Sequence, residues 1–128
     1  MPGIHPQHPA PTLDPRPLEH LRRLIDEERF GRMLEMLFER CQQHGELFGA
    51  AAASPGIDTP TLRQNAHELM DTTGHAGLKR LNQLSRILIE ALRGADPDEI
   101  RRQALAIQQA TGDATSALRH HFSATAQR

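Results

Sequence analysis

A single histidine in the middle of a helical stretch is the residue of this chain best suited to chemistry. His67 lies between Ala66 and Glu68, in a segment whose apolar residues recur every three or four positions. An imidazole ring is a nucleophile near neutral pH, and one of its nitrogens can accept a group and later release it. Because the chain contains eight histidines, residue type alone does not select His67, and its surroundings must do so.

The residues around His67 form one continuous surface if the segment is helical. A helix turns by about 100° per residue, so residues three, four and seven positions apart share a face. A stripe at spacings of four, three and four borders that face and is expected to point inward: Leu62, Ala66, Leu69 and Thr73. We therefore expect His67 to be exposed. Its face is shared by Arg63, Gln64, Met70, Asp71 and Gly74.

The same segment carries a longer pattern around the histidine. Ala66 precedes it, Leu69 follows two positions later, and Gly74, Gly77 and Leu81 follow at seven, ten and fourteen positions. This layout resembles the phosphoacceptor helix of histidine-containing phosphotransfer (HPt) domains, small four-helix bundles that carry a phosphoryl group between receiver domains in bacterial signalling relays. The resemblance covers roughly residues 13–122.

The resemblance implies a role for this surface in a two-component phosphorelay. His67 would accept a phosphoryl group from the aspartate of one receiver domain and pass it to another. Its partners would be receiver domains of response regulators, a hybrid histidine kinase, or both. They would dock on Arg63, Gln64, Met70, Asp71 and Gly74. Since the receiver supplies the magnesium and the acidic pocket, the protein would be a phosphoryl carrier rather than an enzyme, with no cofactor or metal of its own.

Two residues beside His67 depart from the family pattern. HPt domains usually have a lysine three positions after the histidine and a glycine four positions after it, whereas this chain has Met70 and Asp71. Arg63, one turn earlier, is the nearby cation that can replace the lysine. A carboxylate about 6 Å from the phosphoryl charge disfavours phosphorylation by roughly 1–3 kcal/mol. Asp71 can also hydrogen-bond to the imidazole N–H and fix its tautomer, and the sequence does not decide between these effects.

The departures leave a second hypothesis open. A degenerate HPt-like domain would bind a kinase or receiver without accepting phosphate and would act as an adaptor or inhibitor. Met70 would then be an exposed apolar contact, and Asp71 a charge that selects the partner.

A third hypothesis belongs to a different class, a metal-binding helical bundle. His67, Asp71 and His75 are spaced four residues apart, so on a continuous helix they form one stripe that can ligate a divalent cation. Gly74 and Gly77 are expected to end the helix near His75 and to move its side chain away. Metal binding is therefore the least favoured of the three hypotheses.

Composition argues against several other classes. A net charge of −1, with 3% aromatic residues and no Trp or Tyr, argues against nucleic-acid binding, which needs a basic surface or stacking platforms. No segment approaches the length of an apolar membrane span, and no glycine-rich phosphate loop or catalytic carboxylate pair stands out. The single cysteine, Cys41, excludes an internal disulfide and is expected to pack inward. We expect a cytoplasmic monomer.

The elements that must position His67 follow from periodicity and helix-start signals. Residues 1–13 hold four of the nine prolines and are expected to be a disordered arm, followed by a helical bundle over 14–124. Helix starts are expected at Asp14–Pro15, Asp26 or Glu27, Thr59–Pro60, Leu78 and Asp96–Pro97. The first helix is short and the connections are short. Together they predict an all-α fold, an antiparallel four-helix up-down bundle with a short additional N-terminal helix.

Each of the other long helices also carries an apolar stripe that predicts its buried face. In the second helix the stripe is Phe30, Met33, Leu34, Leu37, Cys41, His44 and Phe48. In the fourth it is Leu78, Leu81, Leu84, Leu88 and Leu92. In the fifth it is Ile100, Ala104, Ile107, Thr111, Ala114, Leu118 and His121.

Overall fold

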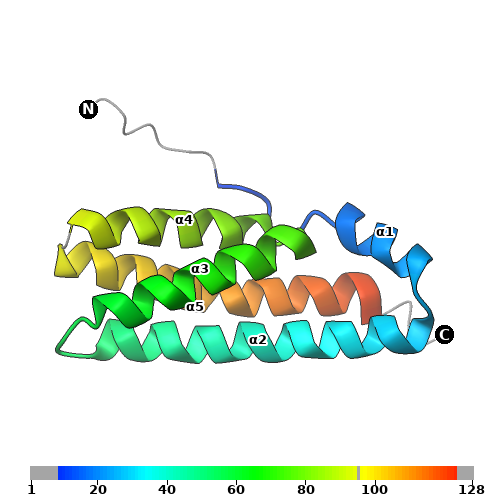
Figure 1. Ribbon diagram of the computed structural model, residues 1–128, viewed down its shortest axis with the longest axis horizontal. Helices are drawn as coiled ribbons and strands as arrows, with labels where there is room; N and C mark the ends of the chain where they lie inside the picture. The colour runs from blue at the N-terminus through cyan, green and yellow to red at the C-terminus, as the bar shows by residue number, and fades with distance from the viewer. Residues whose placement is uncertain (1–8, 95, 124–128) are drawn as a thin grey trace.

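The computed structural model describes residues 9–94 and 96–123, and this part of the chain is all-α, as predicted, with no strand. Figure 1 shows the long helices lying alongside one another, with a short helix near one end. The elements are α1 (Arg16–Leu24), α2 (Glu27–Ala53), α3 (Thr59–Ala76), α4 (Lys79–Gly94), α5 (Pro97–Leu118) and a final π-helical turn, η1 (Arg119–Ser123). No helix among these residues is long and apolar enough to cross a membrane.

Aspartate side chains fix where α2, α3 and α5 begin. The Asp26 carboxylate accepts a hydrogen bond from a first-turn amide of α2 at 2.8 Å, and Asp96 caps α5 in the same way at 3.1 Å. Both positions confirm the predicted starts. α3 differs by one residue, because Asp58 rather than Thr59 supplies the capping oxygen, 3.2 Å from a first-turn amide.

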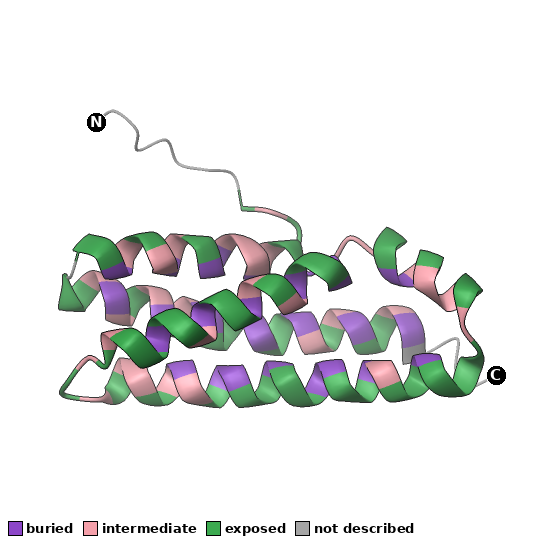
Figure 2. Cartoon of the chain, viewed as in Figure 1, coloured by how far each residue is buried: buried purple, intermediate pink, exposed green. Residues whose placement is uncertain are grey.

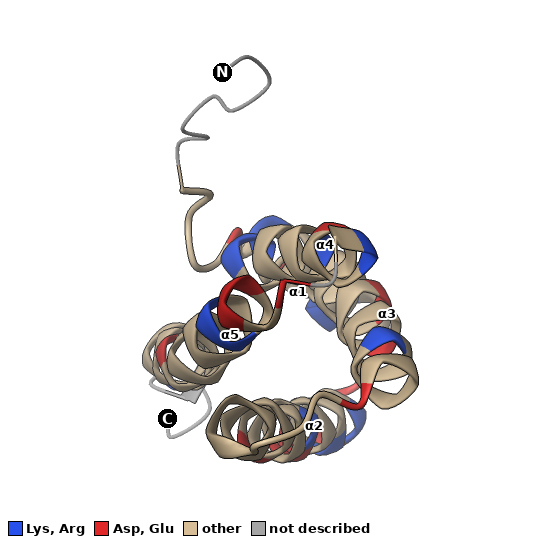
Figure 3. Ribbon diagram, turned by 90° about the vertical axis from the view of Figure 1, so that its left-hand side faces the viewer, with Lys and Arg blue, Asp and Glu red and all other residues tan. Residues whose placement is uncertain are grey.

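The helices contact one another unevenly. α2 packs mainly against α5, α3 packs against α4, and α4 also contacts α5, whereas α2 and α3 share few contacts. Seen end-on, α2, α5, α4 and α3 follow one another around the molecule (Figure 3). α2 and α5 approach closely at Gly45, where any side chain would collide with the Thr111 hydroxyl. Glycine at this position is therefore a packing requirement.

Each helix buries one stripe and exposes the opposite one (Figure 2). The predicted stripes are buried in α3 and α4 and, apart from partly buried Met33, in α2. In the last helix the prediction for His121 is wrong: its side chain is partly exposed, with Nε2 2.8 Å from the Glu19 carboxylate. A π-helical turn holds more residues than an α-helical one. The chain therefore turns Phe122 inward instead, against Phe30, with ring centroids 5.5 Å apart.

The segment before α1 packs on the turn between α3 and α4. The Ala10 amide donates a hydrogen bond to the Gln83 side chain at 3.0 Å, and the Pro11 carbonyl accepts one from the Arg80 amide at 3.0 Å. Residues 9–13 thus differ from the predicted disordered arm. Their prolines prevent a helix but leave the carbonyls free to pair with α4.

Asp14 orients the start of α1. Its carboxylate accepts hydrogen bonds from the Arg16 guanidinium at 2.8 Å and from the Arg16 amide at 3.1 Å, and these lower the pKa of the carboxyl to about 2. Pro15 rather than Asp14 occupies the cap position, so the helix begins one residue later than predicted. The rest of the predicted arm, 1–8, and the end of the chain, 124–128, lie outside the described residues.

Candidate functional site

α3 holds His67 near its middle. The helix continues through Gly74 and ends at Gly77, whose backbone is left-handed with φ of 76°. A side chain at Gly77 would also collide with the Asp14 carbonyl oxygen, so glycine is required there for two reasons. His67 is therefore far from both ends of the helix, where fraying would loosen its position.

The His67 side chain is exposed, as predicted. Among the residues that the structure describes, no hydrogen bond or ion pair engages either ring nitrogen. Two other histidines differ: Nδ1 of His75 lies 2.8 Å from the Asp71 carbonyl oxygen, and Nδ1 of buried His44 lies 2.9 Å from the Arg40 carbonyl oxygen. The His67 ring is therefore exposed and without an internal partner among the described residues, as a nucleophilic role requires.

The predicted docking residues share the outward face of α3. Arg63, Gln64, Asp71 and Gly74 are exposed, and Met70 is partly buried. The opposite side of the helix carries the predicted inward stripe, which is buried from Leu62 to Thr73. A surface with this composition is therefore present around the histidine, and its binding to a receiver remains a prediction.

Asp71 stands one turn after His67 with its side chain exposed. Within the described residues, its carboxylate makes no hydrogen bond to the His67 ring and no ion pair. The sequence left two effects of Asp71 open. Fixing the imidazole tautomer needs a contact that this structure does not contain, whereas repulsion of a phosphoryl group needs only proximity. Arg63, one turn before His67, is likewise without a carboxylate partner among the described residues.

A side-chain network from α4 supports α3 beside His67. The Asn82 amide donates to the Met70 carbonyl oxygen at 2.8 Å and lies 3.4 Å from the Thr73 hydroxyl oxygen. The Arg86 Nε donates in turn to the Asn82 side-chain oxygen at 3.0 Å. Neither Asn82 nor Arg86 was predicted as a site residue, although their i,i+4 spacing beside a leucine stripe marks a shared face. Arg86 adds a second cation at the edge of the predicted docking surface.

The metal-binding hypothesis rests on whether α3 continues through His75. It does, and it ends one residue later at Ala76, near His75 as predicted, because Gly77 takes the left-handed conformation while Gly74 remains helical. His67, Asp71 and His75 therefore lie along one side of the helix. The described residues nevertheless contain no group of three His, Cys, Asp or Glu side chains placed to hold a metal ion.

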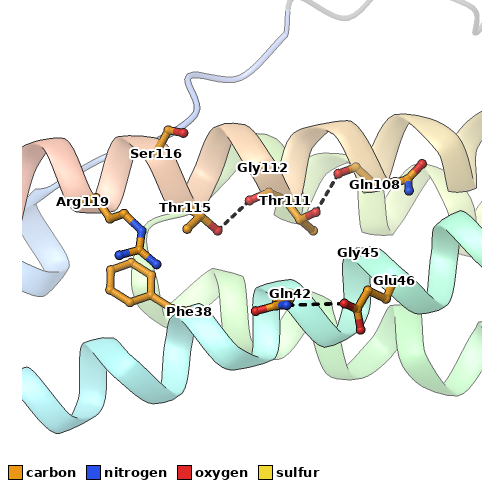
Figure 4. Close-up of a pocket in the computed structure, with 10 residues that line it drawn as sticks. All are labelled: Phe38, Gln42, Gly45, Glu46, Gln108, Thr111, Gly112, Thr115, Ser116 and Arg119. Carbon is orange, nitrogen blue, oxygen red and sulfur yellow. Dashed lines mark hydrogen bonds between the residues drawn. The ribbon is translucent and has the colours of Figure 1, made fainter.

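A hollow of about 410 Å³ lies between α2 and α5, on elements that do not carry His67 (Figure 4). At one end the Arg119 guanidinium lies over the Phe38 ring, 4.4 Å from its centroid. The hydroxyls of Thr111 and Thr115 donate to carbonyls of their own helix at 2.6 and 2.9 Å. Glu46 is the one carboxylate among the described residues that line it, so these residues place no pair of carboxylates in the hollow.

Cys41 is packed in the core, as predicted from its position on the inward stripe of α2. Its side chain is 1% exposed, and burial raises the pKa of the thiol to about 11. A thiol with that pKa is almost entirely protonated at neutral pH and is a poor nucleophile.

The site thus consists of exposed His67, with Arg63 one turn before it and Asp71 one turn after it, on a helix that side chains of α4 contact. Such an arrangement is suited to a surface nucleophile whose reaction partner brings the remaining catalytic groups. No protein-family model, curated protein or solved structure matches this chain.

Proposed function

We propose that this protein is a histidine phosphotransfer protein of a two-component phosphorelay, with His67 as the phosphoacceptor. The observation that carries the proposal is the exposed His67 ring, without a partner among the described residues, in the middle of α3. The sequence pattern from Ala66 to Leu81, which resembles the phosphoacceptor helix of HPt domains, supports it.

In the proposed reaction the carrier supplies only the imidazole of His67. A lone pair on one His67 nitrogen attacks the phosphorus of a receiver's aspartyl phosphate, forming an N–P bond while the P–O bond to the aspartate breaks. The aspartate leaves with the bonding electrons as a carboxylate, and the other ring nitrogen releases its proton to solvent. The reverse sequence passes the group to a second receiver. The protein is then a carrier rather than an enzyme, because the receiver contributes the magnesium and the acidic pocket.

The charges around His67 set how far the carrier becomes phosphorylated. Arg63 stands in for the lysine that Met70 replaces, while the exposed Asp71 repels the phosphoryl group. One carboxylate at this separation shifts the equilibrium against phosphorylation by about tenfold. We therefore propose a carrier that holds its phosphoryl group less firmly than an HPt domain with lysine and glycine at these positions.

The proposal includes the arrangement of the helices. We propose that α2 to α5 form an antiparallel up-down four-helix bundle, with α1 as a short addition. Short connections, and the contacts of α3 with α4 and of α4 with α5, support this arrangement. In the same proposal the protein acts as a monomer in the cytoplasm and meets receiver domains or a hybrid histidine kinase through the His67 face.

The exposed carboxylate of Asp71 favours a second candidate function. An HPt-like adaptor or inhibitor would bind a kinase or receiver through the same face without accepting phosphate. Met70 and Asp71 would then select the partner, and His67 would be one contact among several. The two functions differ in whether the imidazole nucleophile is needed.

Transfer of label from phosphorylated receiver domains tests the phosphoacceptor role. The wild-type protein and its His67→Gln and His75→Gln variants are incubated with a panel of radiolabelled phospho-receivers. We expect label on the wild type and on His75→Gln but none on His67→Gln. His75 is the matched control because it is an exposed histidine on the same helix. The label should survive base and be lost in acid, as in a phosphoramidate.

Two results would contradict the phosphoacceptor role. Label on His67→Gln equal to that on the wild type would place the acceptor elsewhere. Measurable binding of receivers without any transfer of label would support the adaptor function instead.

A further inference from the structure

A hollow of about 510 Å³ lies at the turn between α3 and α4, next to the His67 face. The end of α3, the start of α4 and the N-terminal segment meet there, and its walls include Gly74, Lys79, Asn82 and Arg86. A Cβ atom at Gly74 would have one described neighbour within 4 Å, the Asn82 side-chain amide at 3.5 Å. The hollow is therefore open along the outward face of α3.

Positive charge exceeds negative charge in this hollow. Lys79 and Arg86 line it together with one carboxylate, Asp14. Asp14 is already paired with the Arg16 guanidinium at 2.8 Å and lies 3.9 Å from the Lys79 ammonium. Arg86 uses only its Nε, toward Asn82, so both terminal nitrogens of its guanidinium have no partner among the described residues. An anion that enters the hollow would meet the terminal nitrogens of Arg86, which have no carboxylate partner among the described residues, and Lys79, which shares Asp14 with Arg16.

The attraction comes from these side chains and not from the first two amides of α4. The Lys79 amide donates to the Gly77 carbonyl oxygen at 2.9 Å, and the Arg80 amide donates to the Pro11 carbonyl oxygen at 3.0 Å. Both amides are therefore occupied. Substitution of the cationic side chains should remove most of the affinity for an anion.

The position of the hollow indicates where such an anion comes from. Gly74 is seven residues from His67, about 10 Å along the helix. A partner that covers about 800 Å² of this protein, centred on His67, reaches about 16 Å in every direction and covers the hollow. Helical side chains lean toward the helix N-terminus, so a phosphoryl group on His67 points away from Gly74. The phosphoryl group of His67 is therefore not the anion of this hollow, whereas a partner seated on His67 covers the hollow.

We propose that this hollow, built around Lys79 and Arg86, binds a carboxylate-bearing segment of the partner protein beside the site of phosphoryl transfer. The inference rests on the proposed function, because the partner is the protein that meets His67. Lys79 and Arg86 would then select partners with an acidic rim and increase their rate of association.

A short acidic peptide tests the hollow without any receiver. The ¹⁵N-labelled full-length protein is titrated with the acetylated and amidated tetrapeptide Asp-Glu-Glu-Asp while its amide signals are followed by NMR. We expect saturable shifts at Gly74, Gly77 and the Asn82 side chain, with affinity in the millimolar range. The neutral peptide Asn-Gln-Gln-Asn should cause none of these shifts.

Two double variants decide whether the cations of the hollow are responsible. Lys79→Gln/Arg86→Gln should lose the saturable shifts, whereas Arg93→Gln/Arg102→Gln, with the same change of charge at exposed positions outside the hollow, should keep them. Equal binding by both variants, or shifts spread over all exposed cations, would overturn the proposal. Inorganic phosphate is the third probe, and saturation by phosphate without saturation by the peptide would make the hollow a free-anion site and also overturn it.

Receiver binding separates this inference from the proposed function. For a receiver that labels His67, Lys79→Gln/Arg86→Gln should weaken binding about fivefold or more and reduce its salt dependence. Unchanged affinity together with intact labelling would refute the role of the hollow and leave the phosphoacceptor role standing. Peptide binding without labelling by any receiver would do the reverse.

Discussion

The side-chain amide of Asn82 on α4 donates a hydrogen bond to the main-chain carbonyl oxygen of Met70 on α3, across 2.8 Å. Met70 lies one turn after His67, so this bond fixes the turn of helix that a partner would approach in the proposed function. The Arg86 Nε donates to the same Asn82 side chain at 3.0 Å. The Asn82 side chain therefore links Arg86 on α4 to the α3 backbone one turn after His67.

Asn82→Ala should lower both stability and phosphoryl transfer. The substitution removes the bond to Met70, so the free energy of unfolding in urea should fall by about 1–2 kcal/mol. Transfer of label to His67 should slow as α3 loses its support. Asn65→Ala is the matched control, because the Asn65 amide donates to the Thr61 carbonyl oxygen within α3 itself, at 2.9 Å. Equal losses in the two variants would show that the bond between the helices has no special role.

Asp71→Asn should increase the fraction of the protein that is phosphorylated at equilibrium with a receiver. The variant removes a negative charge one turn from His67 while keeping the size of the side chain, and the expected gain is about tenfold. Quantifying labelled carrier against labelled receiver at equilibrium measures it. Asp113→Asn, at an exposed position on α5, should change nothing. A decrease in Asp71→Asn would mean that the carboxylate assists the imidazole.

Gly45→Ala should destabilise the protein by about 1–3 kcal/mol, because the added methyl group would collide with Thr111 and force α2 and α5 apart. Gly31→Ala in the same helix is the control. A Cβ atom at Gly31 meets no described atom within 4 Å, so this variant should gain about 0.5–1 kcal/mol from helix propensity. Urea unfolding of the two variants should therefore give changes of opposite sign.

Asp14 should make stability depend on pH in the acid range. Its pKa is lowered from 3.8 to about 2 in the folded protein, chiefly by the Arg16 guanidinium. The folded state therefore binds the proton less readily than the unfolded chain, so the stabilisation is present above pH 4 and is lost as the pH falls toward 2. The melting temperature of Asp14→Asn should lie below that of the wild type at pH 6, and the difference should shrink as the pH falls toward 2. A difference as large at pH 2 as at pH 6 would contradict this assignment.

Cys41 should react with iodoacetamide only when the protein opens. Burial keeps the thiol protonated at pH 8, since its pKa is about 11 in the folded state. The rate of alkylation should therefore follow the unfolding transition in urea. Ser116→Cys in a Cys41→Ser background is the control, because position 116 is exposed and a thiol there should react without urea. Rapid alkylation of the wild type in buffer would contradict a packed Cys41.

The parts of the fold predicted from sequence are those that repeat along one helix. The inward stripe from Leu62 to Thr73 and the exposure of His67 follow from the 100° turn per residue, and the structure confirms both. His121 was wrongly placed because a π-helical turn interrupts that repeat. The spacing of apolar residues in the sequence does not predict a π-helical turn.

Contacts between segments far apart in the chain account for the other differences. Asn82 contacts Met70 because α3 and α4 pack in a particular register. The spacing of residues within one helix does not predict how that helix is aligned with its neighbour. The proline-rich composition of residues 9–13 shows that they cannot form a core of their own. It does not show that Ala10 and Pro11 can pair with groups on α4.

Two pairs of helices make most of the contacts between helices, α2 with α5 and α3 with α4. α2 and α5 are clamped together at Gly45 and bear much of the core, whereas α3 carries His67 and is attached chiefly to α4. Substitutions where α2 meets α5 should therefore change the melting temperature more than they change the exposed face of α3. In the proposed function, substitutions on that exposed face would alter partner binding while the contact at Gly45 is kept, so the two properties could be tuned at separate places in the chain.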